Sequence, residues 1–187
     1  SSFTWEPGTW VTTEEPAVED PIISGVVTDI SEAKVTVLGV PDHPGVSAAL
    51  FEPLAAANIN VDMIVQNTSI EGATDISFTV PVADLTTSEQ IVTRVADEIG
   101  AQGVTHDPDI AKVSLVGAGM KTSPGIAAKM FRTLADEGVN IEMISTSTIR
   151  ISVVIDTADL ERAARTLHTA FGLDSTAAYS APLPERS

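Results

Sequence analysis

Hydrophobic and polar residues alternate along several short stretches of the chain, while other stretches carry apolar residues every three or four positions. The alternation over residues 34–38 is typical of a β-strand with one buried face. Residues 46–57, which follow Pro44-Gly45, carry apolar side chains at helical spacing. Further strands are predicted at residues 60–66, 74–80 and 103–106, and a second helix after a cap at Asp84. This half of the chain therefore predicts the order β-α-β-β-α-β.

The same order of elements occurs a second time. Residues 44–68 and 124–148 align without a gap, and 10 of the 25 positions are identical. A repeat of 75–80 residues is too long for a solenoid unit and has the length of a small domain. The second copy predicts strands at 111–116, 139–145 and 149–155, and helices at 126–137 and after Asp159. The predicted fold is α+β: two ferredoxin-like βαββαβ domains, whose antiparallel sheets carry helices on one face.

The second unit is short of one strand, and a β-branched run at residues 22–27 can supply it. The first unit, residues 33–108, would then be inserted into the second, which comprises residues 22–32 and 109–180. Residues 177–180 can add an outer strand, and residues 181–187 form a tail. Residues 1–21 are a lead segment and acidic linker that holds both tryptophans, Trp5 and Trp10. We expect these tryptophans to pack on the body of the protein or on a partner.

Composition limits the classes of function. The 26 acidic residues outnumber the 10 lysines and arginines, for a net charge of −16. Such a surface repels polyanions, which argues against nucleic acid and anionic membranes as partners. The chain is 43% hydrophobic, without an apolar run near 18 residues and without a signal peptide, so a soluble protein is predicted. The absence of cysteine fits the cytoplasm.

The sequence predicts no catalytic residue, no cofactor and no metal. It has no glycine-rich phosphate loop, no cysteine nucleophile, no GxSxG and no HExxH. The three histidines, at positions 43, 106 and 168, lack the spacing of metal ligands. Asp62 and Glu142 are candidate paired carboxylates, but they occupy equivalent positions of separate units, so a shared active site is not expected.

The repeated features suit a small polar ligand. In each unit a strand ends in a loop that reaches Pro-Gly, where a helix begins, and free N–H groups at a helix start favour a carboxylate. In the first unit Asp42 precedes this turn and can accept an ammonium group, and Asn60, Asp62 and Gln66 follow on the next strand. An α-amino acid needs this combination of groups. The alternative is that Asp42, Pro44 and Gly45 serve only the turn.

Four stretches carry a resemblance to a known family: EAKVTVLGVPDHPG (32–45), NINVDMIVQN (58–67), KVSLVGAGMK (112–121) and VNIEMISTSTIRISVVI (139–155). Each unit resembles an ACT domain, and the pair is similar to the regulatory region of aspartate kinase over about residues 22–172. The resemblance implies binding of lysine and/or threonine and feedback inhibition of the first step of the aspartate pathway. It also implies a catalytic (α) subunit as partner and self-association through the ACT-like domains.

The resemblance places effector contacts in both units. They are Asp42, Gly45, Val46, Ser47, Asn60, Val61, Asp62 and Gln66 in the first unit, and Ala127, Ala128, Asn140, Ile141, Ser147 and Thr148 in the second. The family often has alanine at position 47, threonine at 127 and glutamate at 148, so the bound amino acid stays open.

The lead SSFTWEPGTWV resembles the segment that joins the kinase domain to the sensors, but the Lys-Gly-Gly signature of that domain is absent. The chain is therefore similar to a separate β subunit, as in actinobacteria, or to part of a longer chain. Two other functions stay open: a stand-alone amino-acid sensor that regulates another enzyme, and an enzyme that uses Asp62 or Glu142.

Overall fold

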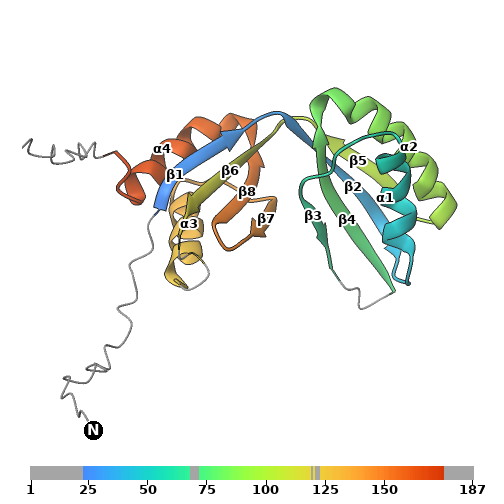
Figure 1. The fold of residues 1–187 in the computed structure, drawn as a ribbon, viewed down its shortest axis with the longest axis horizontal. Helices are drawn as coiled ribbons and strands as arrows, with labels where there is room; N and C mark the ends of the chain where they lie inside the picture. The colour runs from blue at the N-terminus through green and yellow to red at the C-terminus, as the bar shows by residue number, and fades with distance from the viewer. Residues whose placement is uncertain (1–22, 68–71, 119, 121–122, 175–187) are drawn as a thin grey trace, which may run out of the picture.

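The computed structural model describes residues 23–67, 72–118, 120 and 123–174, which form two units of similar architecture (Figure 1). The first unit has a four-stranded antiparallel sheet in the order β3-β4-β2-β5. Its elements, in chain order, are β2 (Glu32–Pro41), α1 (Val46–Ala56), β3 (Ile64–Gln66), β4 (Ala73–Pro81), the short 3-10 helix η1 (Val82–Asp84), α2 (Leu85–Ile99) and β5 (Gly103–Asp107).

The second unit repeats this sheet with one strand of different origin. Its order is β1-β6-β8-β7, and β1 (Ile23–Asp29) pairs antiparallel with β6 although the whole first unit separates them in sequence. The other elements are β6 (Ile110–Gly117), α3 (Gly125–Asp136), β7 (Met143–Thr146), β8 (Arg150–Asp156), η3 (Thr157–Asp159) and α4 (Leu160–Ala170). The predicted α+β fold with two ferredoxin-like units is confirmed. The expected strand at 177–180 and both tryptophans lie outside the described residues.

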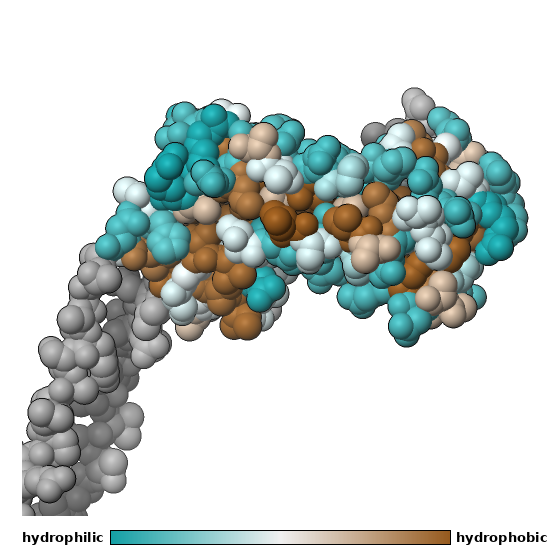
Figure 2. Space-filling model, turned by 90° about the horizontal axis from the view of Figure 1, so that it is seen from above, coloured by the Kyte–Doolittle hydropathy of each residue, from teal (hydrophilic) through white to brown (hydrophobic). Residues whose placement is uncertain are grey.

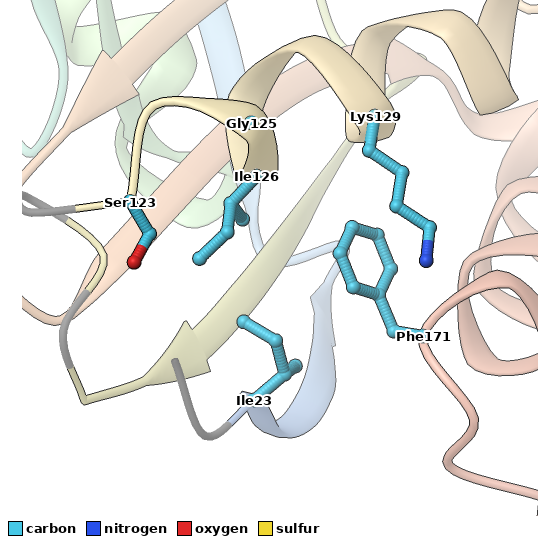
Figure 3. Close-up of a pocket in the computed structure, with 6 residues that line it drawn as sticks. All are labelled: Ile23, Ser123, Gly125, Ile126, Lys129 and Phe171. Atoms are coloured by element: carbon cyan, nitrogen blue, oxygen red, sulfur yellow. The ribbon is translucent and has the colours of Figure 1, made fainter. Parts of the chain in front are cut away.

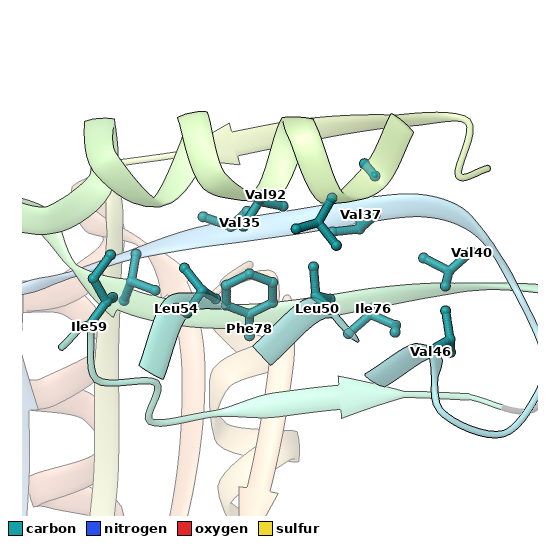
Figure 4. Packing of buried hydrophobic residues seen from close by; sticks show 13 residues of the cluster. Val35, Val37, Val40, Val46, Leu50, Leu54, Ile59, Ile76, Phe78 and Val92 are labelled. Atoms are coloured by element: carbon teal, nitrogen blue, oxygen red, sulfur yellow. The ribbon is translucent and has the colours of Figure 1, made fainter. Parts of the chain in front are cut away.

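Alternation along β2 explains the core of the first unit. Val35 and Val37 are fully buried, whereas Lys34 and Thr36, which alternate with them, point to the other face of the sheet. Helix α1 contributes Leu50 and Leu54, one turn apart, to the same apolar layer (Figure 4). The ring of Phe78 on β4 packs edge-to-face against that of Phe51, with their centroids 5.1 Å apart.

The second unit builds its core from the repeated positions. Met130 and Leu134 on α3 align with Leu50 and Leu54, and both are fully buried. They pack with Val113 and Leu115 of β6, which belong to the same apolar cluster. Many of the repeated positions therefore serve core packing, and only the polar and loop positions of the repeat are free to bind a ligand.

Three local predictions need correction. The strands expected at 60–66 and 139–145 are shorter: β3 begins at Ile64 and β7 at Met143. The preceding residues bring the chain from the end of a helix to the sheet edge, where the N–H groups of Asp62 and Glu142 donate to the carbonyls of Thr79 and Val154, at 3.2 and 2.9 Å. Asp84 stands at the start of α2, but its side chain makes no capping hydrogen bond because η1 already leads into the helix.

The sheet faces that lack helices turn toward each other, so the two units meet there (Figure 1). A small apolar cluster lies between them and combines Met63 of the first unit with Ile110, Met143 and Val154 of the second. Figure 2 shows apolar residues in patches over both units and along the middle of one face, with polar residues between them. None of the described helices is long and apolar enough to cross a membrane.

Candidate functional site

The first predicted half-site lies where β2 leads into α1, beside the end of β3. Gly45 precedes the helix with φ of 96°, a left-handed conformation that glycine adopts without strain. Ser47, in the first turn of α1, donates a hydrogen bond from its Oγ to Oε1 of Gln66 at 3.0 Å. The structure therefore brings Ser47 and Gln66, which are 19 positions apart, into direct contact.

Asp42 and Val46 flank this turn in different ways. The backbone N–H of Asp42 donates to the Gly72 carbonyl at 3.0 Å, which holds the loop, while the residue itself is exposed. Val46 is only 3% exposed and belongs to the first apolar core, so its side chain serves packing. Only the backbone of Val46 is left to contribute to a ligand site, and its N–H donates to the His43 carbonyl at 3.4 Å.

The second predicted half-site is a cavity of about 420 Å³ between the start of α3 and the end of β7. It is lined by three predicted residues, Ala127, Ser147 and Thr148, and by Met120, Ser123, Pro124, Thr146 and Ile151. Ala127 aligns with Ser47 of the first unit, so the second unit lacks the hydroxyl that Ser47 supplies. The two half-sites therefore share their position in the fold and differ in chemistry.

The remaining predicted residues lie on the segments that approach the sheet edges. Val61 packs against the first core and Ile141 against the second. Asn60 and Asn140 are exposed at equivalent positions. Ala128 is exposed on α3, one residue after Ala127, which lines the cavity.

Asp62 is directed across the boundary between the units. Its Oδ2 lies 2.6 Å from Nζ of Lys112, which is only 10% exposed. The same ammonium contacts Glu32 at 2.9 Å and Asp29 at 3.4 Å. The other carboxylate oxygen of Glu32, Oε2, is buried without a hydrogen-bond partner among the described residues. Lys112 therefore neutralises a cluster of acids that both units contribute.

A second lysine makes the reciprocal contact. Lys34 of the first unit pairs with Glu142 of the second, and Asp107 lies 3.8 Å from the same ammonium. Lys34 aligns with Lys112, and Asp62 aligns with Glu142, so each unit offers its lysine to the acid of the other. We call these two cross-unit pairs the reciprocal lysine pairs. They relate the units by an approximate two-fold axis.

The sequence-based prediction missed both lysines. The available signal was their equivalent position in the repeat, on strands whose alternate residues are apolar. The candidate carboxylates Asp62 and Glu142 do not form a shared acid pair, because each is held by a lysine of the opposite unit.

The charges of this cluster shift two pKa values. Burial acts to lower the pKa of Lys112, but hydrogen bonds to Asp62 and Glu32 and their negative charges outweigh it, so the pKa is raised. The pKa of Asp29 is lowered, chiefly because the Ser31 hydroxyl and N–H donate to its Oδ1 at 2.6 and 2.8 Å, with help from Lys112. Both shifts favour the charged forms that the cluster needs.

A small cavity of about 100 Å³ lies beside the reciprocal lysine pairs. It is lined by Asp62 and Met63 of the first unit and by Ser145, Ser147, Arg150 and Ser152 of the second. Asp62 and Ser147 are thus two predicted residues from different units that share one cavity. Ser147 also lines the larger cavity at the start of α3, so it borders both spaces.

Comparisons with known proteins match this architecture. Models of the ACT domain match residues 34–100 and residues 113–171. The regulatory subunit of aspartate kinase from Thermus thermophilus, in its ligand-free form, superposes with a TM-score of 0.76 and 41% identity, over 80% of this chain and 98% of that subunit. The chain belongs to the aspartate kinase regulatory family of paired ACT domains.

Other relatives of this regulatory chain agree. A structure of aspartokinase alpha and beta subunits contains a chain with 48% identity and a TM-score of 0.76, covering 81% of this chain and 99% of that one. Aspartate kinase of Pseudomonas fluorescens is 51% identical over 177 residues, 94% of this chain and 43% of the relative. Aspartokinase of Corynebacterium glutamicum is 48% identical over 92% of this chain and 42% of the relative. The regulatory chain thus spans less than half the length of these curated relatives.

Proposed function

We propose that the regulatory chain binds lysine, threonine or both, and thereby gives feedback inhibition of an aspartate kinase catalytic (α) subunit. The main support is the first half-site, where the left-handed Gly45, the first turn of α1 and the Ser47–Gln66 hydrogen bond place backbone N–H groups beside polar side chains. Asp42, exposed just before this turn, supplies an acid for the ligand ammonium.

The second half-site completes the proposal at the equivalent place in the second ACT domain. Its cavity of about 420 Å³ lies within the size range of small-molecule sites, and the hydroxyls of Ser147 and Thr148 line it. Because Ala127 replaces the Ser47 hydroxyl, we expect the two half-sites to contribute unequally to the bound amino acid.

Inhibition follows from a difference in affinity between two packings of the ACT domains. An effector shifts such an equilibrium only as far as it binds one state more tightly than the other. The reciprocal lysine pairs and the apolar cluster around Met63 and Met143 fix one relative placement of the domains. We propose that effector binding favours one such placement, which the catalytic subunit senses in the cytoplasm.

Calorimetric titration of the pure chain with lysine, with threonine and with both together tests the proposal. We expect saturable heat with at least one amino acid, and weaker binding in the Asp42→Ala variant. Asp97→Ala is the matched control, since it removes an exposed acid from α2. Absence of saturable heat with either amino acid, alone or together, would contradict the proposal.

A further inference from the structure

A second open space on the second ACT domain lies beside the start of α3 and shares Ser123 with the half-site cavity. It has a volume of about 530 Å³ and is lined by Ile23, Ser123, Gly125, Ile126, Lys129 and Phe171. Ile23 and Ile126 point toward each other, and the ring of Phe171 lies beside them (Figure 3). The ammonium of Lys129 lies 4.8 Å from the centroid of that ring. We call this space the corner pocket.

The corner pocket exists because the two ACT domains close their sheets differently. In the first domain the link from α2 to β5 fills this corner. Gln102 in that link donates its N–H to the Leu38 carbonyl at 2.8 Å, and Ala101 packs on the core. In the second domain the matching edge strand is β1, which enters from the N-terminal side, so no link crosses from α4 to the strand. Among the described residues, the corner between Ile23 and Phe171 is therefore left open.

We propose that the lead segment, taken here together with Ile22 as residues 1–22, docks in the corner pocket and places a tryptophan beside Phe171. The lead joins directly to Ile23, which lines the pocket, so docking is an intramolecular event at high effective concentration. Trp10 lies 13 residues before Ile23, which is ample length for the chain to turn back into the pocket. An indole ring buries about 150–250 Å² of surface when it leaves water.

The charge of the corner pocket favours the lead segment, rather than residues 175–187, as its occupant. Among the described residues, Lys129 is the only charged one that lines the corner pocket. The lead carries five acidic residues and no lysine or arginine, whereas residues 175–187 carry one acid and one arginine. The lead also holds three of the eight aromatic residues, Phe3, Trp5 and Trp10. An acidic, aromatic segment matches an apolar pocket with a single cation.

Docking at this position would place the lead against the loop that shapes the second half-site. Ser123 lines both the corner pocket and the half-site cavity. The docking itself does not depend on the proposed effector, because it involves only residues of this chain.

Tryptophan fluorescence reports on the lead alone, since both tryptophans of the chain lie in it. Emission of the full chain is compared with that of a free peptide of residues 1–22, together with acrylamide quenching. We expect emission of the full chain at shorter wavelength and with weaker quenching than the peptide. Lys129→Glu should shift the emission wavelength and the quenching toward the values of the peptide. Arg132→Glu is the control, since it makes the same charge reversal at an exposed site of α3, and it should change neither readout.

A second variant fills the pocket instead of changing its charge. A Cβ at Gly125 would meet no atom of the described residues within 4 Å, and its backbone is not left-handed, so Gly125→Leu should fold normally. We expect it to displace the tryptophan, with unchanged far-ultraviolet circular dichroism. Three results would overturn the proposal: full-chain emission equal to that of the peptide, protection that survives both pocket variants, or protection that disappears on dilution, which would indicate docking onto a second copy.

Discussion

Replacement of Lys112 by methionine removes the ammonium that joins acids of both ACT domains, while it keeps most of the apolar stem. Three carboxylates, of Asp29, Glu32 and Asp62, then lose their common counter-ion. Glu32 suffers most, because its side chain is only 15% exposed and one of its oxygens is already without a partner among the described residues. Asp29 and Asp62 are more exposed and can regain water.

The size of the effect follows from this difference in exposure. Removal of one partner from a buried ion pair costs about 3–5 kcal/mol, whereas an exposed pair contributes about 0–1 kcal/mol. With one nearly buried partner and two partly exposed ones, we expect Lys112→Met to lower the free energy of unfolding by about 2–4 kcal/mol near neutral pH. Lys34→Met is the matched control, since Lys34 is 21% exposed, and we expect a loss of about 1 kcal/mol.

The pH dependence of the stability loss in Lys112→Met distinguishes a loss of charge interactions from a loss of side-chain packing. The lowered pKa of Asp29 means that its contribution is present above its unfolded pKa and is lost as pH falls through the folded value. The raised pKa of Lys112 means that its contribution is complete below the unfolded value, about 10.4, and is lost as pH rises beyond it. The cost of Lys112→Met should therefore be largest between about pH 5 and 10, and smaller near pH 3.

Urea unfolding followed by far-ultraviolet circular dichroism measures these free energies by linear extrapolation. The wild type, Lys112→Met and Lys34→Met are compared near neutral pH and again at about pH 3, below the carboxyl pKa values of the unfolded chain. A Lys112→Met variant as stable as wild type at neutral pH would refute the assigned role of the ammonium. A loss that stays the same at both pH values would show that packing of the stem, not charge, is responsible.

The remaining predictions concern ligand binding, catalysis, assembly and the core. Asp42→Ala and Gln66→Ala should each weaken binding of the effector about 10- to 100-fold without unfolding the chain, and unchanged inhibition of a reconstituted kinase would contradict this. The isolated chain should show no ATP-dependent phosphorylation of aspartate, which a coupled turnover assay checks. Sedimentation should show a dimer that lysine or threonine stabilises, because open sheet edges and repeated units favour two-fold pairing; a micromolar monomer that ignores both amino acids would refute it. Phe78→Ala should cost about 3–5 kcal/mol in urea unfolding, because the ring is fully buried.

Several features of the fold could be predicted because they depend on local patterns. The period-two alternation of Val35 and Val37, and the helical spacing of Leu50 and Leu54, both indicate a face that must be buried. Because of the repeat, Met130 and Leu134 are expected at the matching buried positions of the second unit, and both are buried there. The lengths of β3 and β7 were predicted less well, since alternation continues past the point where the hydrogen-bonded ladder ends.

The candidate half-sites were only partly predictable. The Pro-Gly turn before α1 and the polar residue at the end of β3 are visible in the sequence, and the contact between Ser47 and Gln66 follows from the ferredoxin-like order of the elements. The burial of Val46 is also consistent with its place in the apolar pattern, although the family resemblance implied an effector contact there. The direction of Asp62 toward Lys112 was not predictable, because these residues belong to different domains.

The sequence by itself determined the two copies, the alternation that builds each sheet and the apolar faces of the helices, because each depends on residues near one another in the chain. The tertiary structure decided where the corner pocket opens and which acid each lysine meets. Lys34 and Glu142 are 108 positions apart, and they meet because the two bare sheet faces pack against each other. Such contacts depend on the relative placement of whole domains, which no local pattern of side chains encodes.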